Sequence, residues 1–310
     1  MSRFILRRLL FSVLVLAAVT GATFVATLHV GDPVRVILGR HASAEDIAHA
    51  RRFYGLDKPV TTQLAIYVGH LAHGDLGMSY RYKRPVASLV VERLPRTLLL
   101  GLFAIVLQSI VGVSLGSLAA ARRGRRTDAA IMATTFVATS TPEFLSGTLL
   151  LVGVAYFLGW FPVGGYGVDF GDHLVAAVLP AITLAFAPGA FYARLTRSEL
   201  TEVMTTDYVR TARAKGLSPA AALVRHALPN ALLPVVADLG MSVGSLLGGA
   251  VIVETVFGWP GLGKLAYDAT VGLDVPVVVG CVVVGTVGVL LGNVLGDLAC
   301  AWLDPRIRAA

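Results

Sequence analysis

The chain alternates long apolar segments with shorter polar ones. Apolar runs of about 20 residues, the length needed to cross the bilayer core, occur at Leu9–Val30, Leu98–Ala121, Ala129–Gly159, Leu174–Ala193, Ala231–Val253 and Val277–Leu298. This pattern predicts an all-α integral membrane protein with six transmembrane helices. The composition agrees, because only 15% of the residues are charged whereas soluble domains contain about 25%.

Two of the apolar runs leave an alternative open. The first follows Arg3, Arg7 and Arg8, as in a signal peptide, but it is longer than a signal-peptide core and lacks a small-residue cleavage site, so we expect a span. The third would be about 46 Å long as one helix, and a division at Pro142 would give seven spans. That division would move the basic segment at residues 194–225 outside, so we favour one helix broken at Pro142.

The basic residues define the expected orientation. The N-terminus has three, Arg122–Arg126 four, Arg194–Arg225 six and the C-terminal tail two, and six spans would place all of these on one side. The opposite side has none between Trp160 and His173, and only Lys264 between positions 254 and 276. The positive-inside bias therefore predicts cytoplasmic N- and C-termini. The net charge of +7 is explained by this topology and by anionic headgroups, not by nucleic acid.

Residues 31–96 form a long first outer loop with helical patterning. Ser43 can cap a helix that runs to Tyr54 and ends at Gly55, and a second helix is expected over Val60–His73. A short helix, Pro85–Arg93, should lead into the next span. We expect one transmembrane domain, residues 1–310, with a first span at 1–30, a helical extracytoplasmic cap at 31–96 and a five-span core at 97–310.

A basic hairpin, Asp207–Pro234, lies between apolar segments. Its first helix, Asp207–Lys215, has an acid in its first turn and basic residues in its last, which matches the helix dipole. Gly216 can provide a left-handed C-terminal cap, and Ser218 followed by Pro219 is typical of an N-cap and first helical residue. Taken alone, the segment could equally be a solvated surface hairpin.

Polar residues at membrane depth are costly and therefore informative. The candidates are Gln108, Glu143, Asp238 and Asn293. They could line a water-filled passage or form hydrogen bonds between packed helices, and Asp238 is the most conspicuous of them.

Glycines recur at four-residue intervals within the spans. This spacing lets helix backbones approach closely in lipid, either within the chain or against a second membrane subunit. The glycines are Gly112 and Gly116; Gly240, Gly244 and Gly248; and Gly288, Gly292 and Gly296.

One segment of the chain has the spacing of a catalytic motif. Gly258–Lys264 has the spacing of a phosphate-binding loop, but Leu265 stands where Ser or Thr must bind magnesium. The outer histidines lack metal-site spacing, and no G-x-S-x-G occurs. We therefore expect no catalytic residue, metal or cofactor in this chain, and any ATP-driven work would fall to a partner.

The hairpin resembles a family signature. Arg210-Thr211-Ala212, three residues, Gly216, nine residues and His226-Ala-Leu-Pro229 are similar to the E-A-A-x3-G-x9-I-x-L-P motif of ABC importer permeases. The dipeptide, oligopeptide and nickel branch is the most similar, and the resemblance extends over nearly the whole chain through the strings YGLDKPV, GDLGMSY, ERLPRTL, GGAVIVETVFGWPGLGKL and LDPRIR. Pro229 departs from the branch, which more often has Arg there.

The resemblance implies a non-catalytic permease subunit of the type I importer fold, in a bacterial inner membrane. Its expected partners are a second homologous permease, two cytoplasmic ATPase subunits or domains that bind ATP and Mg, and an extracytoplasmic substrate-binding protein, which the outer cap would dock. The hairpin, residues 198–229, would contain the coupling helix. By position, the residues at the ATPase contact would be Asp207, Tyr208, Arg210, Ala212, Arg213, Lys215 and Gly216.

The expected cargo is peptide. The same machinery carrying nickel, metal chelates or oligosaccharides is an alternative. Two other classes of protein are alternatives. A secondary transporter or channel would need no partner, and a membrane-embedded hydrolase would need paired catalytic side chains at one depth.

Overall fold

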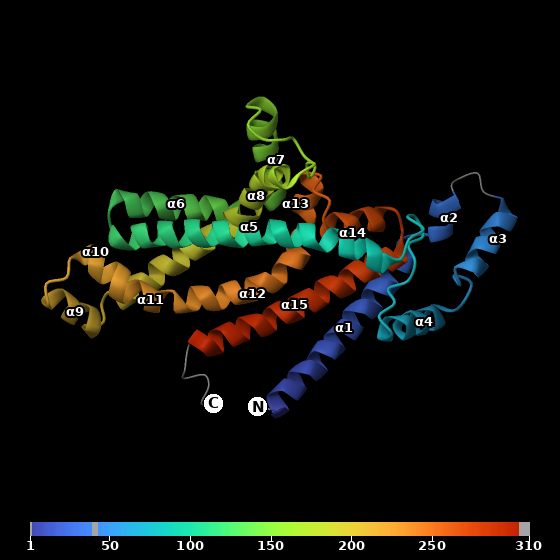
Figure 1. Ribbon diagram of the computed structural model, residues 1–310, viewed down its shortest axis with the longest axis horizontal. Helices are drawn as coiled ribbons and strands as arrows, with labels where there is room; N and C mark the ends of the chain where they lie inside the picture. The colour runs from blue at the N-terminus through green and yellow to red at the C-terminus, as the bar shows by residue number, and fades with distance from the viewer. Residues whose placement is uncertain (1, 39–42, 304–310) are drawn as a thin grey trace. The chain divides into compact units, whose positions relative to one another are not determined.

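The computed structural model describes residues 2–38 and 43–303, and the basic tail residues Arg306 and Arg308 lie outside them. Within the described residues the regular secondary structure is helical, and the only β-pairing there is an isolated bridge between Met78 and Pro85 (Figure 1). It divides into two compact units, which are described separately. The first contains Met1–Thr97, Leu247–Val251 and Pro260–Leu290; the second contains Leu98–Leu246, Ile252–Trp259 and Leu291–Ala310.

The first unit packs helices from both ends of the chain around two apolar clusters. One joins Val86 and Val90 at the start of α5 to α14 and α15; the other joins Phe24 of α1 to α15, with α4 residues packed against it. The helices are α1 (Ser2–Val30), α2 (Pro33–Leu38), α3 (Ala44–Phe53), α4 (Val60–Ala72), the first part of α5 (Val86–Ala121), α14 (Leu262–Val271) and most of α15 (Val275–Leu303).

The cap helices follow the sequence prediction closely. Ser43 closes a capping box at the start of α3, in which its hydroxyl accepts from the Asp46 N–H and donates to the Asp46 carboxylate. Gly55 and Gly74 follow α3 and α4 with positive φ angles of 67° and 78°. These local signals are confirmed because each depends on residues within one or two turns.

The short helix expected at Pro85–Arg93 is not separate. It continues through Pro95 into the next span as α5, so the helix is confirmed and only its expected end at Arg93 is wrong. A proline inside a helix removes one backbone hydrogen bond, but a long membrane helix can tolerate that loss. Thr97, two residues after Pro95, also ties α5 to α14 by accepting a 2.8 Å hydrogen bond from the Leu262 N–H.

The second unit contains the remaining helices and two short π-helical segments. The π-helical segments are Leu151–Phe157 after α7 and Leu223–Ala227 after α10. The helices are the rest of α5, α6 (Arg126–Ser140), α7 (Glu143–Leu150), α8 (Phe170–Val203), α9 (Asp207–Ala214), α10 (Pro219–Ala222), α11 (Leu228–Ala231), α12 (Leu233–Gly249) and α13 (Val251–Val256). Helices α12 and α13 end or begin at the boundary between the units.

The long third apolar run is broken at the predicted place. Helix α6 ends at Ser140, Pro142 precedes α7, and the chain turns by 104° between the two halves. Among the residues that the structure describes, four helices are long and apolar enough to cross a membrane, or up to six if each of two bent helix pairs counts as one span. The second bent pair, Pro219–Ala231 with Leu233–Gly240, turns by 41°.

Four of the regularly spaced glycines, Gly112, Gly116, Gly240 and Gly296, pack within the chain. A Cβ at Gly112 would lie 2.6 Å from the Tyr192 Cβ, and one at Gly116 would lie 2.5 Å from the Ala193 carbonyl oxygen. A Cβ at Gly240 would lie 2.5 Å from the Gly296 Cα. All three contacts lie inside the second unit, so at these positions the small residues bring α5 against α8 and α12 against α15.

Candidate functional site

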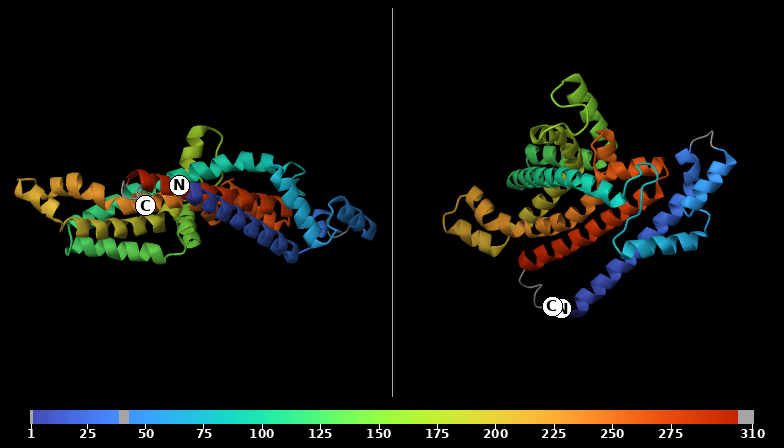
Figure 2. Two further views of the ribbon diagram at one scale, coloured as in Figure 1. Left: turned by 90° about the horizontal axis from the view of Figure 1, so that it is seen from below. Right: turned by 45° about the vertical axis from the view of Figure 1, so that its right-hand side comes forward.

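The hairpin α9–α11 begins just beyond the end of α8 (Figure 2). Helix α9 starts at Asp207 and is capped by Lys215, and Gly216 follows with φ +94°. The Ser218 hydroxyl accepts a 3.3 Å hydrogen bond from the Ala221 N–H, with Pro219 as the first helical residue. The predicted left-handed glycine cap and Ser-Pro start are therefore confirmed.

An apolar cluster holds the hairpin together. Val209 of α9 is buried with Leu200 of α8 and with Leu223 and Ala227 of the returning segment. These contacts fix α9 against the end of α8 and against the returning helical segment of the hairpin. Each buried side chain would lose its contacts if α9 moved alone. The hairpin and the end of α8 therefore form one packed body.

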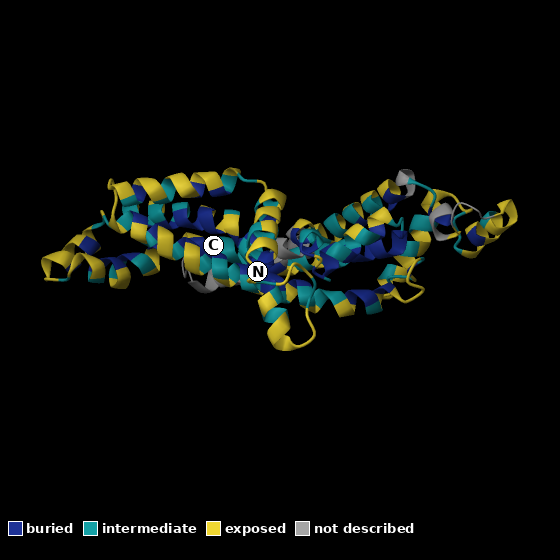
Figure 3. Cartoon of the chain, turned by 90° about the horizontal axis from the view of Figure 1, so that it is seen from above, coloured by how far each residue is buried: buried dark blue, intermediate teal, exposed yellow. Residues whose placement is uncertain are grey.

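The opposite face of α9 is exposed and mostly charged. The Asp207 carboxylate is 97% exposed, and its contact with Arg210 at 3.6 Å is a surface ion pair. Tyr208 is oriented by Asn230, whose side-chain amide donates to the tyrosine hydroxyl at 3.1 Å. Figure 3 shows this mixture of exposed and buried residues. The exposed predicted residues are Asp207, Tyr208, Arg210, Arg213, Lys215 and Gly216.

Ala212 is the exception among the predicted contact residues. It is 7% exposed, whereas the other predicted contact residues are exposed. The structure therefore separates the predicted set into an exposed polar surface and one buried packing residue.

Two of the intramembrane polar candidates meet the same turn of α8. The Asp238 carboxylate on α12 accepts a 2.9 Å hydrogen bond from the Tyr192 hydroxyl, which is also 2.9 Å from the Ser242 hydroxyl. Gln108 on α5 is buried, and its Cα would lie 3.5 Å from a Cβ at Gly189, three residues before Tyr192. Hydrogen-bonded helix packing thus describes the surroundings of Asp238.

Glu143 and Asn293 lie elsewhere in the second unit. Glu143 is in the first turn of α7, directly after the Pro142 break, and is half-buried. Asn293 is half-buried on α15 beside the buried Gly292.

Asp274, which sequence reasoning did not select, anchors a distant loop in the first unit. It immediately precedes α15 and is 1% exposed. Its carboxylate accepts hydrogen bonds from the Ser79 hydroxyl at 2.5 Å, the Tyr80 N–H at 3.0 Å and the Arg81 N–H at 3.1 Å. A lone acid before an apolar run was the only local signal, and it suggests a helix cap, not this long-range role.

A second unpredicted pair lies at the ends of α6 and α8. Arg197 binds Asp128 through two parallel hydrogen bonds of 2.5 and 2.7 Å, and the Asp128 side chain is 6% exposed. The same carboxylate accepts a 3.0 Å bond from the Gly124 N–H. Asp128 thereby ties the α5–α6 loop to the end of α8.

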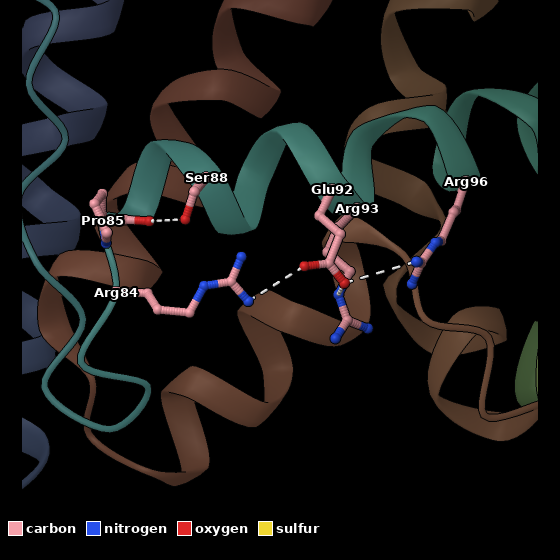
Figure 4. Close-up of polar contacts among 6 residues, drawn as sticks. All are labelled: Arg84, Pro85, Ser88, Glu92, Arg93 and Arg96. Atoms are coloured by element: carbon pink, nitrogen blue, oxygen red, sulfur yellow. Dashed lines mark hydrogen bonds and ion pairs between the residues drawn. The ribbon is translucent and has the colours of Figure 1, made fainter.

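The first turns of α5 carry a charged network (Figure 4). Glu92 lies 3.4 Å from Arg84 and 3.6 Å from Arg96, with Arg93 at 3.7 Å. All these side chains are at least one quarter exposed, so each pair contributes little to stability. One carboxylate among several arginines does not form an acid–base pair for catalysis.

The glycine-rich loop Gly258–Lys264 packs as a connector between α13 and α14. Trp259 is fully buried, and Lys264 pairs with Asp268 at 3.0 Å within α14. Helix α13, not a strand, precedes this loop, which lacks the strand–loop–helix arrangement of a phosphate-binding site. Across the residues that the structure describes, no group of three His, Cys, Asp or Glu side chains could hold a metal.

Two models of known protein families match this chain. Residues 112–309 match the family described as the binding-protein-dependent transport system inner membrane component, and residues 1–101 match its N-terminal region. The chain belongs to this family. The predictions of a permease and of a subunit that is not itself an enzyme are thereby confirmed, and this permease is a multi-pass inner-membrane protein. The family description implies no cofactor for it.

Characterised relatives match over the full length of the permease. It is 38% identical over 315 residues to the oligopeptide transport system permease protein AppB of Bacillus subtilis, covering 99% of this chain and 100% of the relative. It is also 38% identical over 337 residues to the dipeptide transport system permease protein DppB of Escherichia coli K12, covering 99% of each chain.

A solved structure supports the fold. The inward-facing MetNI methionine ABC transporter includes a chain with a TM-score of 0.56 and 21% identity, covering 70% of this permease and 96% of that chain. The predicted all-helical importer permease fold is therefore confirmed.

Proposed function

We propose that this permease forms half of the translocation pathway of an ATP-driven importer for peptides. It would pair with a second homologous permease, two cytoplasmic ATPase subunits or domains that bind ATP and Mg, and an extracytoplasmic substrate-binding protein. The peptide cargo is supported by the relatives, which are an oligopeptide and a dipeptide transport system permease.

Helix α9 is the proposed contact with the ATPase. The observation that carries this proposal is its division into two faces: Val209 and Ala212 are buried, whereas Asp207, Arg210 and Arg213 are exposed. A buried root makes the helix move with the end of α8, and an exposed charged face can bind a partner. ATP-driven closure of the ATPases could then shift the spans between two global states.

The distribution of basic residues supports the proposed orientation. The α5–α6 loop and the hairpin would be cytoplasmic together with both termini. Residues 31–96 would then lie outside as the docking cap for the binding protein, within a single transmembrane domain.

Site-specific cross-linking tests the α9 contact. In a background with Cys281→Ser and Cys300→Ser, Arg213→Cys should cross-link to the ATPase in the purified complex. Val168→Cys, which is 94% exposed but on the opposite side in the proposed topology, is the matched control. Cross-linking of Val168→Cys alone would contradict both the contact and the orientation.

The cargo requires a separate experiment. The partner binding protein, purified with its ligand, should release peptides detectable by mass spectrometry. Nickel, another metal chelate or an oligosaccharide in their place would assign the alternative cargo. Gradient-driven transport by the permease without an ATPase would instead indicate a secondary transporter or channel.

Asp238 is the leading candidate for a residue of the passage, ahead of Glu143, Gln108 and Asn293. Its partial exposure and its hydrogen bond to Tyr192 are compatible with a polar edge that faces water in one transport state. In the same cysteine-free background, Asp238→Cys should react with a water-soluble thiol reagent in at least one nucleotide state. Absence of labelling in every state would assign Asp238 to helix packing alone.

A further inference from the structure

An apolar groove runs along the second unit between α5, α6 and α8. Its volume is about 400 Å³, which is within the range of about 300–1,000 Å³ typical of ligand sites. The groove extends from Leu107 to Leu115 on α5, from Ala138 to Ala130 on α6 and along α8 from Ile182 to Ala190. These helices belong to candidate spans, so the groove lies at membrane depth.

The lining of the groove is almost entirely apolar. Its polar side chains include Thr134 and Thr135, and both hydroxyls donate within α6, to the Ala130 carbonyl at 2.9 Å and to the Met132 carbonyl at 2.8 Å. Because both hydroxyls already donate to backbone carbonyls, neither requires a polar group from a ligand. An alkyl chain fits the chemistry of such a wall better than a peptide or an ion.

One end of the groove leads to a cluster of arginines. Ala130 lies four residues after Arg126, about 6 Å along α6, and Leu115 lies seven residues before Arg122, about 10 Å along α5. Arg122, Arg123, Arg125 and Arg126 are all exposed. The N-terminus of α6 points into the same loop, and its dipole adds to the positive potential.

The nearest acidic group does not oppose this potential. Asp128 is held by the bidentate Arg197 pair and by the Gly124 N–H. Its charge is therefore compensated inside the helix ends, while the loop it fixes presents the four arginines outward.

We propose that this groove binds one anionic phospholipid, with an acyl chain between α5, α6 and α8 and the phosphate among Arg122–Arg126. The combination of a hydrocarbon slot and a cationic end matches the two parts of such a lipid. A neighbouring membrane helix would match the slot, but its cytoplasmic end would bring further Lys or Arg to the arginine cluster.

Native mass spectrometry of the full-length purified permease tests the site, with phosphatidylglycerol and phosphatidylcholine as probes. Wild-type chain should retain phosphatidylglycerol in preference to phosphatidylcholine. Replacing Arg122, Arg123, Arg125 and Arg126 by Gln should weaken phosphatidylglycerol retention at least about tenfold, since each basic residue near the headgroup contributes. Retention of phosphatidylcholine should change little.

A pair of tryptophan variants separates the slot from general surface charge. Ala130→Trp should fill the groove and release phosphatidylglycerol, whereas Ala133→Trp, on the exposed face of the same helix and not part of the lining, should not. Equal retention by the two variants would overturn the proposal. So would retention by the isolated chain but loss from the assembled complex, which would identify the groove as a subunit interface. The lipid proposal and the proposed peptide import are tested separately, because lipid retention is measured on the purified permease without any transport.

Discussion

Two connecting segments of this permease are held in opposite ways. The loop at residues 77–85 in the first unit is fixed by a buried charge, because Ser79, Tyr80 and Arg81 all donate to the Asp274 carboxylate. The hairpin α9–α11 in the second unit is fixed by apolar packing, with Val209 of α9 buried against Leu200 and Leu223 in its apolar root. Both have a defined shape, but their charges lie in different places.

The difference separates a structural connector from a contact surface. In the first loop the carboxylate is inside and its hydrogen-bonding capacity is used by the chain itself. In the hairpin, the polar groups of Asp207, Arg210 and Arg213 remain exposed because apolar residues supply the cohesion. A segment supported in this second way can bind another protein through its charges without losing its own fold.

The largest expected effect is at the buried carboxylate. Asp274→Ala would leave three donors near the buried site without their acceptor, which should destabilise the first unit by about 3 kcal/mol or more. Thermal unfolding of the purified permease in detergent would measure the loss. Asp268→Ala removes a partly exposed acid of the same unit, and its surface pair with Lys264 should be worth no more than about 1 kcal/mol. Similar losses for both variants would contradict the anchoring role of Asp274.

The glycine cap should affect coupling more than folding. At φ +94° Gly216→Val imposes a left-handed conformation on a β-branched residue, at a cost of about 1–2 kcal/mol, so the competent hairpin should become about tenfold less populated. ATP hydrolysis should then be uncoupled from transport in reconstituted complexes, with membrane insertion intact. Gly55→Val, at φ +67° in the cap, is the matched control. Transport at the wild-type rate by Gly216→Val would exclude the role.

The apolar root of the hairpin should respond to a smaller change. Val209→Ala removes two buried methyl groups and should cost about 1.5 kcal/mol, measured as earlier proteolysis of the hairpin during heating. Thr211→Ala, on the exposed face of the same helix, should change stability by less than about 0.5 kcal/mol. If the two variants behaved alike, the division of α9 into two faces would be refuted.

The smallest effect concerns an exposed charge whose hydrogen bonds lie within a single helix cap. Hydrogen bonds from the Ser43 side chain and backbone lower the pKa of Asp46 below the ordinary aspartate value of about 3.9. A lowered pKa in the folded state means that the capping box stabilises α3 above the ordinary value and is lost as the pH falls through the lowered one. The protection of the α3 amides against hydrogen exchange, relative to the intrinsic rate at each pH, should therefore fall on acidification. In Ser43→Ala this acid-dependent component should be absent, and its persistence would assign it to another group.

Local signals in the sequence predicted the features that depend on adjacent residues. Gly216, Ser218 and the Ser43 capping box are each defined by two to four neighbouring positions, and the structure shows each as expected. Span length is similarly local, since it follows from the apolar runs. The position of the Pro142 break was predictable for the same reason, whereas its angle of 104° depends on how the two halves pack.

Long-range contacts were not predictable from one sequence. Asp274 and Ser79 are 195 residues apart, and Asp128 and Arg197 are 69 apart, so no spacing rule connects them. Ala212 matched the family signature, but only the packed hairpin shows that it faces inward. The expected helix end at Arg93 is the converse error, because the helix continues through Pro95 into the long apolar span.

The open surroundings of Gly216 distinguish handedness from size. No heavy atom lies within 4 Å of the position that a Cβ would occupy there, so a larger residue has room, and only the positive φ angle excludes it. A D-amino acid prefers this half of backbone space. D-alanine introduced at position 216 by chemical ligation should therefore preserve the hairpin, and the requirement for glycine becomes a requirement of chirality.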